Sequence, residues 1–161
     1  MSILLDMSEV MYSEKSISRE DYGDWQTGYE FAKSVCLYLR SSGVNPDVIV
    51  EPTCGVGNFI AAAVDVFDRV EKVYGVEIFQ GYIHQTEQKL REYQDIGRID
   101  GYKLYNTNVF TFDFDEIVNE NRNKNVLILG NPPWVTNSGL GKTNGTNLPW
   151  KSNINKTRGI E

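Results

Sequence analysis

Four residues near the end of this chain have types and an order suited to holding a reacting group in one geometry. Directly after the aliphatic run VLILG, where a predicted strand ends, come Asn131, Pro132, Pro133 and Trp134. The Asn131 amide offers an oxygen acceptor, the prolines restrict the backbone, and Trp134 offers a flat aromatic face. The alternative for this motif is a rigid strand-to-loop turn with Trp134 in the core.

A glycine-rich segment, EPTCGVGNF, follows an earlier predicted strand. Gly55 and Gly57 let the backbone approach a ligand closely, because glycine reaches dihedral angles closed to other residues. Ile60 replaces the third glycine of a dinucleotide fingerprint, which disfavours pyrophosphate binding. About twenty residues beyond Gly57, Glu77 closes the next strand, where an acid can accept hydrogen bonds from both ribose hydroxyls. These residues predict a ligand with a ribose and no pyrophosphate; a tight turn and a solvated strand-end acid are the alternative.

Aliphatic runs and helical stripes alternate along the chain. Strands are predicted for DVIVEPT, KVYGVEIF, YKLYNTNVF and residues 125–130, and helices for residues 29–41, for 59–70 and around Ile83, Leu90 and Tyr93. This alternation predicts an open α/β sheet with parallel strands. The nearly continuous apolar run of the last strand predicts cover on both faces. Lys89 and Arg91 are predicted to lie on the solvent side of the third helix.

The charge, the cysteines and the apolar runs of the sequence indicate which partners the protein can have. Sixteen basic residues against twenty-two acidic ones give a net charge of −6, the wrong sign for a protein that grips a phosphate backbone over its whole surface. Cys36 and Cys54 lie in different predicted elements and form neither a disulfide framework nor a metal-ligand spacing, so no metal is expected. No signal peptide and no apolar run of membrane length is visible, which predicts a cytoplasmic protein with no membrane partner.

The motifs resemble those of the class I S-adenosylmethionine-dependent methyltransferases, and within them the DNA amino-methyltransferases of restriction-modification systems. EPTCGVGNF resembles their glycine-rich first motif, VYGVEIF the second with its ribose acid, and NPPW the catalytic fourth. GDWQTG resembles the N-terminal motif usually written Gln-Thr-Pro, with Gly28 in place of the proline. The motif order resembles the subgroup that methylates the N6 of adenine. The resemblance implies a Rossmann-like methyltransferase fold, an open, mostly parallel sheet with flanking helices, in incomplete form.

The resemblance also implies a set of cofactor-binding residues for S-adenosylmethionine. They are Gln26, Thr27, Glu51, Pro52, Thr53, Gly55, Gly57, Asn58, Phe59, Glu77, Ile78, Asn108, Val109, Phe110 and Asn131. Thr27 would help to hold the methionine carboxylate. Asn108 stands where family members often carry an acid; its side-chain oxygen can accept the adenine amine, without a charge.

For catalysis, the resemblance implies Asn131, Pro132, Pro133 and Trp134. The exocyclic amine of adenine is a poor nucleophile, because its lone pair is delocalised into the ring. The Asn131 side-chain oxygen and the Pro132 carbonyl would accept its protons, with the geometry fixed in advance. Trp134 would stack on the target adenine of double-stranded DNA after the base is flipped out of the duplex.

The chain is predicted to be a single, partial catalytic domain. Residues 1–45 would form a helical segment with the N-terminal motif, residues 46–134 the cofactor-binding α/β core, and residues 135–161 a polar loop or tail. Family members continue beyond the fourth motif, so the remaining C-terminal part or a specificity subunit is expected to read DNA. Two alternatives remain: N-methylation of a protein glutamine or of RNA, and a catalytically inert module that binds a cofactor or partner.

Overall fold

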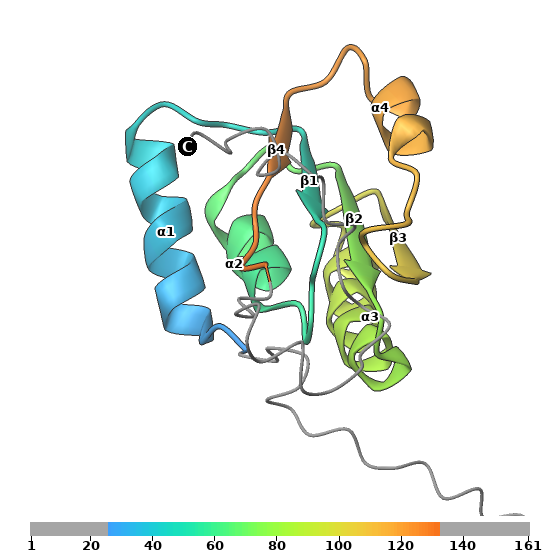
Figure 1. Ribbon diagram of the computed structural model, residues 1–161. Coiled ribbons are helices and arrows are strands. Elements are labelled where there is room, and N and C mark those ends of the chain that lie inside the picture. The colour runs from blue at the N-terminus through green and yellow to red at the C-terminus, as the bar shows by residue number, and fades with distance from the viewer. Residues whose placement is uncertain (1–25, 133–161) are drawn as a thin grey trace, which may run out of the picture.

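The computed structural model describes residues 26–132, which form a parallel sheet with helices on both faces (Figure 1). The strands of this part are β1 (Val48–Glu51), β2 (Lys72–Glu77), β3 (Gly101–Asn106) and β4 (Val126–Ile128), in the order β3-β2-β1-β4. All three pairings are parallel. The predicted open, parallel α/β sheet is therefore confirmed. Because the strand order reverses beside β1, the carboxyl ends of β1 and β4 border a switch point, where ligands bind in such sheets.

The helices divide between the two faces of the sheet. They are α1 (Tyr29–Ser41), α2 (Asn58–Val66), α3 (Gln80–Asp95) and α4 (Asp115–Glu120). The first three build the larger core on one face, and α4 builds a smaller core on the other. Ile49 belongs to the larger core and its neighbours Val48 and Val50 to the smaller, as side chains that alternate along a strand must. None of these four helices is long and apolar enough to cross a membrane.

Small side chains bring α2 close to its neighbours. Ala62 and Ala63 are fully buried, as is Ala32 on the facing side of α1. Alanine favours helix and leaves little bulk between two backbones, so α2 packs tightly between α1 and the sheet. This fixes the start of α2, and with it the loop that follows β1.

Strand β4 differs from its prediction. Its apolar run predicted cover on both faces, but the side chains of Val126 and Ile128 are 41% and 66% exposed. Leu127 and Leu129 pack against the larger core on the opposite face. Within residues 26–132, the smaller core contains β1 and β2 residues and Ile117 of α4, and it does not extend over β4. A continuous apolar run is a local signal, whereas cover depends on which elements stack above it.

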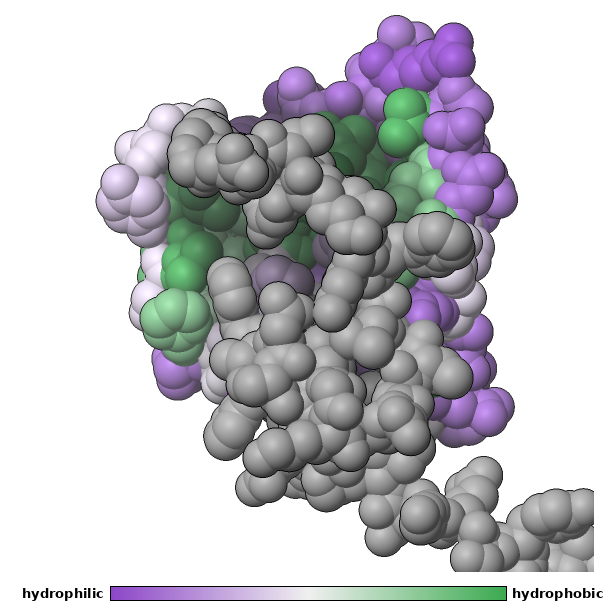
Figure 2. All heavy atoms as spheres, in the orientation of Figure 1, coloured by the Kyte–Doolittle hydropathy of each residue, from purple (hydrophilic) through white to green (hydrophobic). Residues whose placement is uncertain are grey.

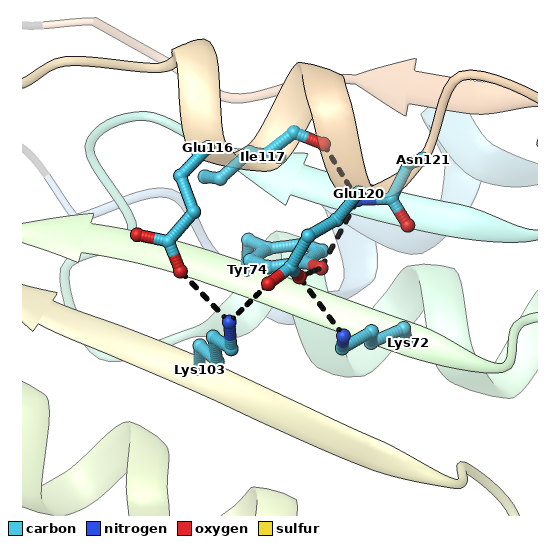
Figure 3. Close-up of polar contacts among 7 residues, drawn as sticks. All are labelled: Lys72, Tyr74, Lys103, Glu116, Ile117, Glu120 and Asn121. Atoms are coloured by element: carbon cyan, nitrogen blue, oxygen red, sulfur yellow. Dashed lines mark hydrogen bonds and ion pairs between the residues drawn. The ribbon is translucent and has the colours of Figure 1, made fainter.

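Acidic side chains bind α4 to the sheet (Figure 3). Glu120 Oε2 accepts hydrogen bonds from the Tyr74 hydroxyl at 2.7 Å and from Lys72 Nζ at 3.1 Å. Lys103 Nζ lies 2.7 Å from the other Glu120 oxygen and 2.9 Å from Glu116 Oε1. Two strands therefore supply the cations and hydroxyl that hold one turn of α4. Part of the acidic segment that begins at Asp113 therefore contacts the sheet.

Replacing Glu120 with Gln is expected to lower the midpoint of thermal unfolding, because the amide lacks the charge that binds two lysines. Hydrogen bonds from Lys103, then Tyr74 and Lys72, lower the pKa of Glu120 from 4.5 to about 2. A carboxyl whose pKa is lowered by folding stabilises the fold above its unfolded pKa, and this contribution is lost as the pH falls toward the folded value. Circular dichroism should therefore show the largest difference between wild type and Glu120→Gln above about pH 5, shrinking in more acidic buffer.

The matched control is Glu116→Gln, since Glu116 makes one ion pair where Glu120 contacts two lysines. Its effect should be smaller at every pH. A difference between wild type and Glu120→Gln that does not change with pH would contradict the role given to the charge.

Candidate functional site

The loop between β1 and α2 bends sharply at two glycines. Gly55 has φ +50° and Gly57 has φ +74°, in the left-handed region that favours glycine. The Gly57 amide donates a 2.7 Å hydrogen bond to the Cys54 carbonyl, which closes the turn. A Cβ on Gly57 would lie 2.7 Å from Thr86 Cγ2, so space as well as dihedral angle requires glycine here.

The amides of this loop are already bonded within the protein. The Gly55 N–H donates to Glu77 Oε2 at 2.9 Å, and the Val56 N–H donates to Gln26 Oε1 at 3.1 Å. With the Gly57 amide on Cys54, three successive N–H groups have protein acceptors. Loops that bind phosphate instead present a set of converging N–H groups to the anion. This geometry argues against phosphate binding at these three amides.

Glu77 lies at the carboxyl end of β2 with both oxygens oriented by the backbone. Its Oε1 accepts a 2.8 Å hydrogen bond from the Phe79 N–H, and its Oε2 accepts the bond from Gly55. The residue is 9% exposed. Each carboxylate oxygen can accept a second hydrogen bond, so the group can receive two hydroxyls in a fixed direction.

A second carboxyl, that of Glu51, lies at the end of β1 and is only 3% exposed. Its Oε2 has no hydrogen-bond partner among the described residues. Burial raises the pKa of Glu51 well above its usual range, opposed by a hydrogen bond from the Ile60 backbone. The end of β4 passes close by, since a Cβ on Gly130 would lie 3.3 Å from Glu51 Cγ.

The start of the NPPW motif lies beside the glycine-rich segment. Thr53 Oγ1 donates a 3.5 Å hydrogen bond to the Asn131 carbonyl, which links the residues after β1 to those after β4. Asn131 is half-buried and Pro132 is exposed. Pro133 and Trp134 lie outside the described residues. The sheet order thus brings the first and fourth motifs together, and the full arrangement of acceptors and indole stays a prediction.

The N-terminal motif also contacts the loop. Gln26 accepts the Val56 N–H, and the Asn58 side chain donates a 2.8 Å hydrogen bond to the Thr27 carbonyl. Residues that precede α1 are therefore held against the start of α2. Of the remaining first-motif positions, Pro52 is half-buried and Phe59 belongs to the larger core. The role of Thr27 toward a carboxylate stays a prediction.

Residues after β2 and β3 form the far side of the site. Asn108 Oδ1 accepts a 3.0 Å hydrogen bond from the Phe110 N–H, a local turn that uses the oxygen predicted to meet the adenine amine. The contact of Asn108 with the adenine amine stays a prediction. Ile78 and Phe110 are 41% and 54% exposed, and Val109 is half-buried.

Two residues of α3 contact the loop and were missed as site residues by the sequence analysis. Thr86 Oγ1 donates a 2.9 Å hydrogen bond to the Gly55 carbonyl. Lys89 Nζ donates to the Val56 carbonyl at 2.6 Å and to Asn58 Oδ1 at 3.0 Å. The solvent-side prediction for Lys89 is wrong, because its amine reaches across to the loop, and burial lowers its pKa. Thr86 precedes buried Leu90 by four residues, a spacing that could have placed it on the inner face.

Metal-ligating side chains do not cluster in residues 26–132. No group of three or more His, Cys, Asp or Glu residues in this part of the chain could hold a metal ion. Cys36 and Cys54 are both buried free thiols, and burial raises the pKa of each.

The known proteins to which this chain is similar are methyltransferases. The chain is homologous to an enzyme of that class, although no family model matches it. The relative is the Type II methyltransferase M.NspV of Nostoc sp., with 43% identity over 141 residues. The match covers 88% of this chain, which spans only 28% of the length of the relative.

Solved structures give weaker likenesses. A candidate RNA methyltransferase from Pyrococcus horikoshii has a TM-score of 0.49 and 17% identity, covering 61% of this chain and 47% of that one. A methyltransferase from Geobacter sulfurreducens has a TM-score of 0.41 and 12% identity, covering 64% and 61%.

Changing Gly57 to Ala is expected to reduce the free energy of unfolding by about 1–3 kcal/mol. An alanine is strained in the left-handed backbone conformation of this residue, and its Cβ would clash with the Thr86 side chain. Gly81→Ala is the matched control: a Cβ there meets nothing within 4 Å, and the residue lies in α3, where alanine is favoured. Chemical denaturation of both variants measures the difference. Equal stabilities for the two variants would contradict the strain assigned to the loop.

Proposed function

We propose that this chain is the cofactor-binding part of a site-specific DNA methyltransferase of a restriction-modification system, which transfers a methyl group from S-adenosylmethionine to the N6 amine of a flipped adenine. The observation that carries the proposal is the fixed carboxylate of Glu77 at the end of β2, bonded by the Gly55 amide in a loop that has no room for a side chain at Gly55 or Gly57. The 43% identity to a Type II methyltransferase supports the same class.

The described residues fit S-adenosylmethionine better than a phosphorylated nucleotide. Glu77 can receive the two ribose hydroxyls, while the loop amides have protein acceptors and would not serve a phosphate. At the other end of the cofactor is an amino acid with an ammonium group. The oxygen of buried Glu51 that has no partner within residues 26–132 is a suitable acceptor for it.

The adenine of the cofactor is proposed to lie between the residues after β2 and those after β3. Exposed Ile78 and Phe110 supply apolar surface there, and Asn108 supplies an uncharged acceptor. Thr27, beside the loop, is proposed to help hold the carboxylate of the methionine end. When bound, the cofactor supplies a methyl group attached to a positively charged sulfur.

For the transfer itself, Asn131 and Pro132 are proposed to orient the acceptor. Their oxygens would accept hydrogen bonds from the target amine and draw its lone pair out of the ring, so that no titrating base is needed before attack. The contact between Thr53 and the Asn131 carbonyl supports this, because it holds the motif beside the first strand end. Pro133 would keep Pro132 extended, and Trp134 would stack on the base.

Double-stranded DNA is the proposed substrate, and target reading is assigned to residues outside 26–132 or to a specificity subunit. With a net charge of −6, the chain as a whole does not attract phosphates, so DNA contacts must be local. A cytoplasmic location remains a prediction that fits this substrate.

Replacing Glu77 with Ala should weaken the binding of S-adenosylmethionine by about 100-fold, since two hydrogen bonds to a charged acceptor are lost. Calorimetric titration of the 161-residue chain measures this, with circular dichroism to establish folding. The control is Glu87→Ala, which removes an acid paired with Arg91 on the surface of α3. Similar affinities for Glu77→Ala and Glu87→Ala would refute the ribose role, and no binding by folded wild-type chain would refute the cofactor site.

Replacing Asn131 with Ala should lower the rate of methyl transfer by about 100-fold or more while cofactor affinity changes little, because the lost acceptor acts on the target amine. Transfer of labelled methyl groups is measured with the protein as its gene encodes it, on duplex DNA, RNA and protein acceptors. Asn123→Ala, in the exposed turn after α4, is the control. Labelling of cytosine, RNA or protein in place of adenine would overturn the substrate assignment.

A further inference from the structure

Glu51 is a buried acid in a place that does not suit a negative charge. Glu51 is the last residue of β1 and is only 3% exposed. The backbone of Ile60 bonds to the carboxyl, while Oε2 has no partner among the described residues. Ionising a carboxyl whose buried oxygen has no hydrogen-bond donor costs free energy, because that oxygen has lost the water that would stabilise its charge.

The ionisable groups around Glu51 come from three other elements and the loop. The charge of Glu77, at the end of β2, opposes ionisation of Glu51. Lys89 of α3 favours ionisation, but its amine is bonded to the loop and only its field acts on Glu51. The thiols of Cys36 on α1 and Cys54 in the loop are both buried, and their pKa values are raised. Within residues 26–132, no cation is bonded to the carboxyl itself.

The other carboxyl of the site is held differently. Glu77 receives backbone N–H donors on both of its oxygens, whereas Glu51 Oε2 has no partner among the described residues. Burial first, and then the charge of Glu77, raise the pKa of Glu51.

We propose that Glu51 holds a proton in the free chain and releases it to solvent when S-adenosylmethionine binds, so that cofactor binding is coupled to proton release. This inference rests on the proposed cofactor site. The ammonium group of the cofactor brings the positive N–H donors that Oε2 lacks, and a cation in contact with a buried carboxyl favours its ionised form. The cofactor thereby supplies the charge partner that the fold does not.

The coupling makes affinity depend on pH in one direction. In the pH range where Glu51 of the free chain is protonated, the affinity for the cofactor should increase about tenfold for each pH unit. The reason is that binding releases one proton, which is easier at higher pH. The increase ends at the pH where free Glu51 ionises by itself.

The experiment is calorimetric titration of the 161-residue chain with S-adenosylhomocysteine, which has the ammonium group and cannot react. Titrations in phosphate between about pH 6 and 8 follow the affinity. A paired titration in Tris near about pH 7.5 gives the number of protons released, because the ionisation enthalpies of the two buffers differ. The matched ligand is 5′-methylthioadenosine, which keeps the adenine, ribose and thioether and lacks the amino and carboxyl groups. We expect release of about one proton with the first ligand and none with the second.

Glu51→Gln is the matched variant, since it resembles the protonated acid in shape and charge. It should bind S-adenosylhomocysteine about tenfold or more weakly, with no proton release and little change of affinity with pH. Its folding should not suffer: a carboxyl whose pKa is raised by folding lowers stability as pH rises above its unfolded value of 4.5. Glu51→Gln should therefore be at least as stable as wild type at neutral pH.

Infrared difference spectroscopy gives a readout that does not need binding. The carbonyl stretch of a protonated carboxyl should appear in free wild type near neutral pH, be absent from Glu51→Gln, and disappear when S-adenosylhomocysteine is added. Absence of this band from free wild type would overturn the proposal. Binding with equal heats in the two buffers would overturn the proton release and leave the cofactor site standing. No binding by folded wild type would overturn both.

Discussion

The hydrogen bond that the Gly55 amide donates to Glu77 is the contact on which the candidate site depends. It joins the loop after β1 to the end of β2, and it is possible because Gly55 adopts a left-handed backbone beside the Gln26 side chain. Without it, the acid would lose one of the two donors that set its direction, and a buried amide would lack an acceptor. The shape of the loop and the orientation of Glu77 are therefore one property of the fold.

Helix α3 stabilises the same loop from its other side. Thr86 and Lys89 donate to the carbonyls of Gly55 and Val56, while the amides of those residues donate elsewhere. Because the polar groups of the bend are paired within the protein, a ligand meets backbone surface that it can approach closely. Such a surface suits a ligand recognised through its hydroxyls and its packing, whereas a phosphate would need free donors.

The sequence alone predicted those features of the fold and site that depend on neighbouring residues in the chain. The β-branched run that ends in Glu77 and the two glycines beyond β1 are short-range features, so strand, turn and acid could be placed from the sequence. Lys89 could not, because its contacts depend on a loop that only the folded chain positions. The exposure of Ile128 is likewise set by which elements stack over β4.

Glu51 and Glu77 end neighbouring strands, but their carboxyl groups lie in different environments. This difference affects how the site would discriminate among ligands that contain adenosine. Glu77 offers an oriented carboxylate to hydroxyls, and Glu51 offers an acceptor that becomes favourable only with a cation. A dinucleotide or a nucleotide triphosphate would bring negative charge toward these acids and find the loop amides occupied. An adenosine with a cationic amino acid tail would satisfy both acids at once. Under the proposed function, the arrangement that binds the cofactor is thus also the arrangement that rejects the more abundant phosphorylated nucleotides.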